Sequence, residues 1–94
     1  MKVGGISNAE PANNEIQTLS LSFKAQVEAQ SHTTYSSFQA VKYTKQVVAG
    51  MNYKIKVKAD QTYIHLSVFK PLPHTNQPAT LNQVQLNKSE NDPL

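Results

Sequence analysis

The sequence predicts an α+β domain in which one N-terminal helix packs against a meander of four antiparallel strands. Three observations predict this class. Apolar residues at helical spacing end before residue 34, segments of alternating apolar and polar residues follow from about Ser37, and 94 residues without a cysteine leave room for one core. We therefore expect a single domain over residues 1–94 that is stabilised by packing alone.

The helix is predicted to begin after Asn13, whose side chain is suited to capping. Glu15 then lies in the first turn, near the positive end of the helix dipole. The apolar stripe consists of Ile16, Leu19, Phe23 and Val27. We expect the helix to end within residues 31–34, because the serine and threonines there compete for helical hydrogen bonds.

The first strand is predicted from about Ser37 to Val47, with an irregularity inside it. Phe38 and Ala40 share one alternation phase, whereas Val41 and Tyr43 share the other. A β-bulge near Ala40 would reconcile the two phases and would bend the strand so that it can wrap a helix.

The remaining strands follow from clean alternation and turn signals. Apolar residues alternate over residues 53–59 and again over residues 64–68, on either side of an Asp60-Gln61 turn. A loop with three prolines precedes a last strand from about Thr80 to Asn87. We expect a flexible N-terminal arm over residues 1–5 and a loose C-terminal end over residues 89–94.

Composition excludes several classes of function. Without cysteine, the chain forms no disulfide, thiolate metal site or thiol nucleophile, and without a signal-like apolar run we expect a cytoplasmic protein with no membrane partner. The formal charge is +3, but every basic residue is a lysine. Because base and phosphate recognition favour arginine, we expect no nucleic-acid partner. Lys54, Lys56 and Lys58 are predicted to lie on the solvent face of a half-buried strand.

No group of residues has the spacing of a catalytic or metal site. His65 lies in mid-strand opposite the apolar phase, and His32 and His74 lie in predicted turns, so we expect three separate surface histidines. Metal-binding pairs and a glycine-rich phosphate loop are absent from the sequence. We predict a protein that is not an enzyme and that needs no cofactor or metal.

The segment Gln46-Val47-Val48-Ala49-Gly50 carries apolar side chains where a hairpin turn should be polar. One interpretation is that this hairpin tip, residues 46–50, contacts a partner. The other is that the valines end a strand and pack on the core while Gly50 supplies the turn. A Gly4-Gly5 pair and the segment Pro71-Leu72-Pro73-His74 are two further candidate contact elements.

These three elements resemble those of the cystatins, inhibitors of papain-like cysteine proteases, and specifically the stefins, or type 1 cystatins. The similarity covers nearly the whole chain. The matching segments, in order, are Met1-x-x-Gly4-Gly5, Ala9-x-Pro11-Ala12, Glu15-Ile16-Gln17, Tyr35, Ala40-Val41-x-Tyr43, Gln46 to Gly50, Asn52-Tyr53, Ile55-Lys56-Val57, His65-Leu66-x-Val68-Phe69-Lys70 and Leu72-Pro73-His74. The lack of cysteine also suits type 1 cystatins rather than secreted ones.

The resemblance implies a cystatin-like fold, in which a four- to five-stranded antiparallel sheet wraps the N-terminal helix. It also implies a reversible, tight-binding, competitive inhibitor of papain and of cathepsins similar to L, S, H and B. The inhibitor would block the active-site cleft with a wedge formed by the N-terminal arm and two hairpin loops. The protease-binding residues implied are Val3, Gly4, Gly5, Gln46, Val47, Val48, Ala49, Gly50, Leu72, Pro73 and His74.

Departures from the stefin pattern leave two alternatives open. Pro71 precedes Leu72-Pro73, Val84 replaces the usual tyrosine of the last strand, and the usual aromatic end is missing after Leu94. One alternative is a stefin-derived or consensus-like binding scaffold with another target. The other is a self-associating protein whose first hairpin opens and exchanges strands between two copies, in place of the expected monomer.

Overall fold

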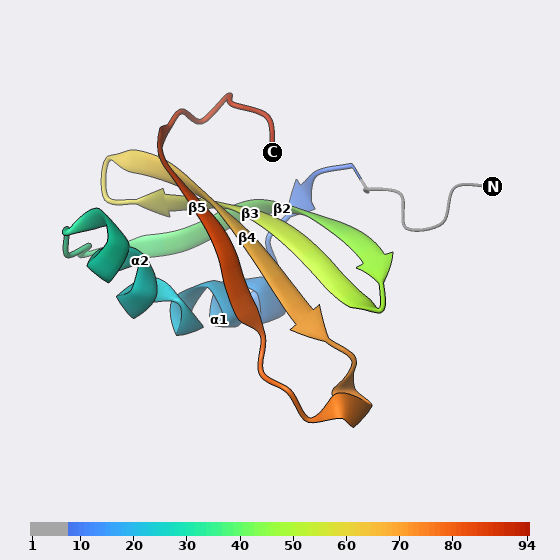
Figure 1. Ribbon diagram of the computed structural model, residues 1–94. Coiled ribbons are helices and arrows are strands. Elements are labelled where there is room, and N and C mark those ends of the chain that lie inside the picture. Colours follow the sequence, from blue (N-terminus) through green and yellow to red (C-terminus); the bar gives the residue numbers. More distant parts are fainter. Residues whose placement is uncertain (1–7) are drawn as a thin grey trace.

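The computed structural model describes residues 8–94 and shows a five-stranded antiparallel sheet, in the order β1-β2-β3-β4-β5, with two helices on one face (Figure 1). The elements are β1 (Glu10–Pro11), α1 (Asn14–Ser22), α2 (Lys24–Ser31), β2 (Phe38–Val48), β3 (Gly50–Ala59), β4 (Thr62–Pro71), the 3₁₀ turn η1 (Pro73–Thr75) and β5 (Thr80–Lys88). This architecture confirms the predicted α+β class and the cystatin-like fold.

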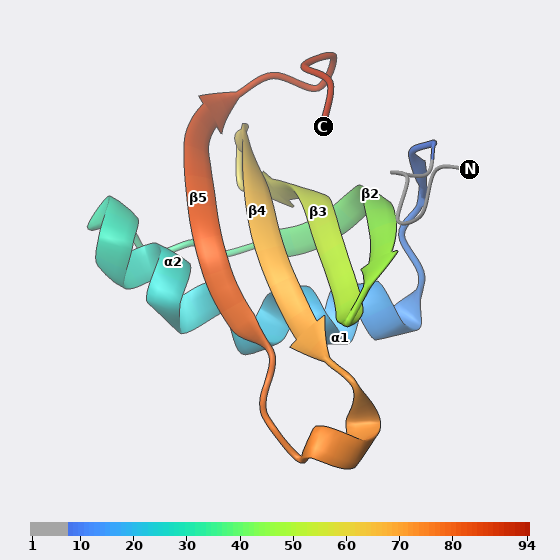
Figure 2. The ribbon, with the colours of Figure 1, turned by 45° about the vertical axis from the view of Figure 1, so that its right-hand side comes forward.

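The core lies between the helices and the face of the sheet that curves around them (Figure 2). From the helices it receives Ile16, Phe23 and Val27, all less than 7% exposed. From the sheet it receives mainly Phe38, Ala40, Tyr43, Tyr53, Ile55, Val57, Ala59, Ile64, Leu66 and Val68. The predicted helical stripe and strand alternation therefore meet in one apolar layer, whose burial is the main source of stability in a chain without disulfides.

The helix starts and ends where the sequence predicts, but it is interrupted in the middle. Asn13 caps α1 by accepting a 2.9 Å hydrogen bond from the amide of Ile16, and His32 ends α2 in the left-handed conformation. At Phe23 the backbone turns to φ −105° and ψ 3°, so the single predicted helix is wrong and two segments form. Nearby, the Ser22 hydroxyl donates to the Leu19 carbonyl at 2.6 Å. Serine is disfavoured in helices because its hydroxyl competes in this way with backbone amides for helical carbonyls.

The first strand of the sheet was not predicted from the alternation pattern. β1 has only two residues, Glu10 and Pro11, paired with Tyr43 and Lys42 of β2. The Ala12 amide extends this contact by donating to the Val41 carbonyl at 2.9 Å. Two residues are too few to show periodicity, and the meander alone accounts for only four of the five strands.

The predicted bulge in β2 is confirmed. The pairing of β2 with β3 shifts register between Ala40 and Lys42. The side chain of Gln17 bonds both flanking backbone groups: its amide nitrogen donates to the Phe38 carbonyl at 3.1 Å, and its oxygen accepts from the Ala40 amide at 2.6 Å. Helix α1 thus satisfies backbone groups near the bulge and fixes the bend of the strand.

The last strand lies at the free edge of the sheet and is irregular at two places. Its pairing with β4 shifts register between Tyr63 and His65 and again between Ser67 and Val68. Asn87, inside the first irregularity, has a positive φ of 59°. Consecutive pairing is therefore limited to two short runs, His65, Leu66 and Ser67 with residues 83–85 and Val68 and Phe69 with residues 80–81.

Two residues predicted to lie at the solvent face of the sheet are buried. Lys54 and Lys58 are exposed as predicted, but Lys56 is only 5% exposed and His65 only 6% exposed. These two residues oppose each other across β3 and β4, and the Lys56 ammonium donates a 2.5 Å hydrogen bond to the Glu90 carbonyl. The predictions were wrong because the segment after β5 supplies a partner and cover on this face.

Acid should destabilise the fold through His65. Burial, followed by the ammonium of Lys56, lowers the pKa of His65 below its usual value, so the folded state favours the neutral ring. This stabilising contribution is complete above about pH 6.5 and is lost as the pH falls through the lowered pKa. We expect the unfolding free energy, measured by urea unfolding, to decline as the pH falls below about 6.5. His65→Gln should reduce this decline. His74→Gln, which changes an exposed histidine, is the control and should show the same decline as the parent chain. Equal declines in the parent and both variants would contradict the role given to His65.

Ser20 is a polar residue within the apolar stripe and should be replaceable. It is fully buried, and its hydroxyl has no hydrogen-bond partner among the described residues. Because an unsatisfied buried hydroxyl is unfavourable and alanine is a better helix former, Ser20→Ala should raise the unfolding free energy by about 1 kcal/mol. Ser22→Ala, which removes an exposed and satisfied hydroxyl, is the matched control. Urea unfolding in which Ser20→Ala is the less stable variant would show that the hydroxyl has a partner.

Candidate functional site

The hairpin between β2 and β3 ends in a very short apolar tip. Val48 pairs with Gly50, so Ala49 alone forms the turn. Val47 is 59% exposed and Val48 is 41% exposed. The interpretation that these valines pack on the core is therefore wrong, and they are available to contact a partner.

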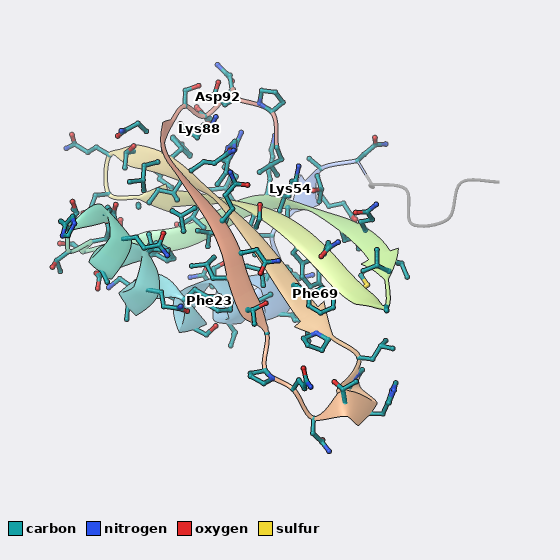
Figure 3. All side chains as sticks on the ribbon, in the orientation of Figure 1. Phe23, Lys54, Phe69, Lys88 and Asp92 are labelled. Atoms are coloured by element: carbon teal, nitrogen blue, oxygen red, sulfur yellow. The ribbon has the colours of Figure 1, made fainter. Side chains whose placement is uncertain are left out.

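Gly50 makes this tight tip possible. Its φ of +131° belongs to a region that side chains rarely permit, and a Cβ at this position would lie 2.6 Å from the Lys70 carbonyl oxygen and 2.9 Å from the Phe69 ring. Figure 3 shows Phe69 near the end of β4 that faces this hairpin. The glycine therefore allows β3 to begin in close contact with β4.

The second loop, residues 72–79, leaves the same end of the sheet. Gly50 pairs with Pro71, the last residue of β4, so the loop begins beside the hairpin tip (Figure 2). Pro73–Thr75 form a 3₁₀ turn in which the Thr75 amide and hydroxyl donate to the Leu72 carbonyl at 3.1 Å and 2.7 Å. Leu72, Pro73 and His74 are exposed, with Leu72 at 40%.

The two loops contain most of the exposed large apolar residues. In the described part of the chain these are Leu21, Val47, Val48, Leu72 and Leu86. Three of the five are at the hairpin tip and the second loop, while Leu21 and Leu86 lie elsewhere. Single exposed apolar residues are ordinary, but a group of them at one edge indicates a contact surface. Val3, Gly4 and Gly5, the third predicted contact element, lie outside the described residues.

Residues behind the two loops hold them in place. The Lys70 ammonium bonds the Glu15 carboxylate at 3.0 Å, which joins the end of β4 to the first turn of α1. This hydrogen bond raises the pKa of Lys70. Both side chains are substantially exposed, so the pair orients the strand end more than it stabilises the fold. Beside it, the rings of Tyr43 and Tyr53 pack 6.0 Å apart.

The histidines do not form a site. His32 ends α2, His74 lies in η1, and His65 is buried in the middle of β4. Within residues 8–94, no group of three histidine or carboxylate side chains is arranged to hold a metal ion. The features that stand out are the apolar loops at one end of a wrapped sheet.

Comparison with known proteins identifies this arrangement. The family described as Cystatin domain matches residues 4–91. This chain belongs to the cystatin family. That family consists of cysteine protease inhibitors and not of enzymes, in agreement with the prediction from the sequence.

Relatives of this cystatin include several stefins. The chain is 47% identical to human Cystatin-A over 97% of the chain and 94% of the relative. It is 43% identical to bovine Stefin-C over 98% of the chain and 92% of the relative. It is 41% identical to pig Leukocyte cysteine proteinase inhibitor 1 over 100% of the chain and 92% of the relative. These similarities place the cystatin among the type 1 members, as the sequence motifs indicated.

The helices of this cystatin are short. Over residues 8–94, none of them has the length and apolar character required to cross a membrane.

Replacement of Gly50 should damage the hairpin of this cystatin rather than merely alter its surface. Gly50→Ala must place a Cβ against the Lys70 carbonyl in a strained backbone conformation, so we expect a loss of more than about 2 kcal/mol of unfolding free energy. Ala49→Ser, at the exposed neighbouring position, should change stability little. The comparison can be made by thermal and urea unfolding, and equal stability of the two variants would refute the role of Gly50.

Proposed function

We propose that this cystatin is a reversible, tight-binding, competitive inhibitor of papain-like cysteine proteases, including papain and cathepsins similar to L, S, H and B. The observation that carries the proposal is the exposure of Val47, Val48 and Leu72 on two loops that leave one end of the sheet together. A relative whose name is Leukocyte cysteine proteinase inhibitor 1 supports the class of target.

The wedge in this proposal consists of residues 3–5, the hairpin tip and residues 72–74. Val47 and Val48 exclude water from the primed side of the cleft, near the catalytic histidine, while Ala49 and Gly50 permit close approach of the backbone. Gln46 opens the hairpin tip, and Leu72, Pro73 and His74 contact the protease farther along the cleft. Between Gln46 and Gly50 there is no charged side chain that would have to be desolvated.

The N-terminal arm completes the wedge on the other side of the cleft. Val3 occupies the non-primed apolar subsite just ahead of Gly4, and Gly4 lets the backbone pass beside the catalytic cysteine without a Cβ clash. No peptide bond of the inhibitor is aligned for attack, so the cleft is blocked without chemistry and the inhibitor leaves intact. An interface of ordinary size, about 800 Å² per partner, is compatible with tight binding when its apolar anchors are well packed.

In this proposal the active form is a cytoplasmic monomer that binds neither nucleic acid nor membranes. Opening of the first hairpin would join β2 and β3 into one extended strand and would remove the tip, so strand exchange between two copies should abolish inhibition. A binding scaffold with a different target is the second alternative, and the unaltered sequence of Gln46 to Gly50 argues against it.

A charge at the hairpin tip should abolish inhibition. We expect Val48→Asp to weaken inhibition of papain and of a cathepsin-L-like enzyme at least about a hundredfold, because the interface would bury an unpaired carboxylate at a cost of several kcal/mol. Leu21→Asp is the matched control, because Leu21 has a similar exposure, 47%, and lies on α1, away from the two loops. It should inhibit like the parent chain in a titration of active protease.

The same titration separates the alternatives. Stoichiometric inhibition by the parent and by Leu21→Asp, lost in Val48→Asp, supports the wedge. A folded monomer that does not inhibit would favour the scaffold. Elution at the mass of a dimer, together with lost inhibition, would favour strand exchange.

A further inference from the structure

A small cavity lies on the face of the sheet opposite the helices, beneath the end of the chain. Its volume is about 50 Å³, enough for an ion of a few heavy atoms. The cavity is lined by Lys54, His65, Leu66, Ser67, Gln83, Gln85 and Leu94. Five of these seven side chains carry a hydrogen-bonding group, so the cavity offers several polar partners beside its apolar surface.

His65 has an unused hydrogen-bonding atom at this cavity. The residue is only 6% exposed, and its Nε2 atom is buried with no hydrogen-bond partner among the described residues. A buried polar atom without a partner is rare in folded proteins and calls for one, such as a bound ion or a water molecule. The ring therefore offers a donor when it is protonated at Nε2.

The charges around the cavity favour an anion. Lys54 and Lys56 on β3 and Lys88 at the end of β5 all lie close enough to His65 to act on its charge, and Asp92, in the segment after β5, is the carboxylate that does so. The Asp92 carboxylate already accepts from the Ser89 amide at 2.7 Å. Both ion pairs found in residues 8–94 lie elsewhere, between Lys24 and Glu28 and between Lys70 and Glu15.

We infer that this cavity binds a small inorganic oxyanion of the sulfate or phosphate class. The ammonium of Lys54, the Ser67 hydroxyl and the side-chain amides of Gln83 and Gln85 donate to it, and His65 provides a further donor. Leu94 and Leu66 supply the apolar part of the lining. The site is separate from the wedge and goes beyond the proposed function.

Binding of the oxyanion is coupled to protonation of His65. The empty site disfavours the charged ring because the ring is buried among lysines. A dianion beside the ring reverses that preference, so the bound state takes up a proton. Affinity should therefore rise by up to about tenfold for each pH unit as the pH falls from the pKa of His65 in the bound state to its lower pKa in the empty site.

The inference can be tested with sulfate, which stays a dianion over the pH range of histidine titration. We expect a titration of the ¹⁵N-labelled chain to give saturable NMR shifts at Ser67, Gln83 and Gln85, stronger at about pH 5.5 than at about pH 7.5. Sodium chloride at equal ionic strength should give none of these saturable shifts. His65→Gln should remove the pH dependence of the affinity while retaining the fold.

Two lysines of β3 provide a matched pair of variants. Lys54 and Lys58 are both exposed, but only Lys54 lines the cavity. We expect Lys54→Gln to weaken sulfate binding roughly tenfold, as for loss of one charge-assisted hydrogen bond, and Lys58→Gln to leave it unchanged. Shifts that do not saturate, that appear equally with chloride, or that fall equally in both variants would overturn the inference. If the α-carboxylate of Leu94 already fills the cavity, sulfate will give no saturable shift, and this result would also overturn the inference.

Discussion

The wrapped shape of the sheet depends on the junction between Gln17 and the bulged part of β2. One side chain of α1 bonds the carbonyl of Phe38 and the amide of Ala40, on the segment where the alternation phase changes. An antiparallel sheet without such a bend would lie flatter and leave part of the helical stripe uncovered. The two hydrogen bonds of Gln17 therefore help to bury the core, because they hold the strand in the bent shape that covers the helices.

The two loops acquire their position from this bent sheet and not from contacts with each other. β2 and β4 end and β3 begins at the same end of the sheet, where Gly50, the first residue of β3, pairs with Pro71, the last residue of β4. Gly50 then allows the strands to approach at the point where any side chain would clash with Lys70. The apolar tip is therefore supported by the paired ends of β2, β3 and β4, although Ala49 alone forms its turn.

Local sequence patterns predicted much of this molecule. Capping by Asn13, the phase change at Ala40 and the apolar hairpin tip each depend on neighbours within a few residues, and the structure bears them out. The burial of Lys56 was not predictable in this way, because its partner Glu90 lies 34 residues further along the chain. The alternation of apolar and polar residues assigns a side chain to one face of the sheet, but it does not predict which other segment of the chain covers that face. Periodicity also missed the break in the helix at Phe23 and the strand β1. Each involves only one or two residues, which is too few to alter a periodic pattern.

The irregular edge strand β5 has a consequence for association in concentrated solution. A long, regular edge offers a continuous row of free backbone groups on which another chain can build a fibril. Here the two register shifts divide the consecutive pairing into two short runs, residues 80–81 and residues 83–85, and Asn87 has a positive φ of 59°. An incoming strand would find only short runs of aligned backbone groups, so an edge whose one charged residue is Lys88 can remain open to water without acting as a template.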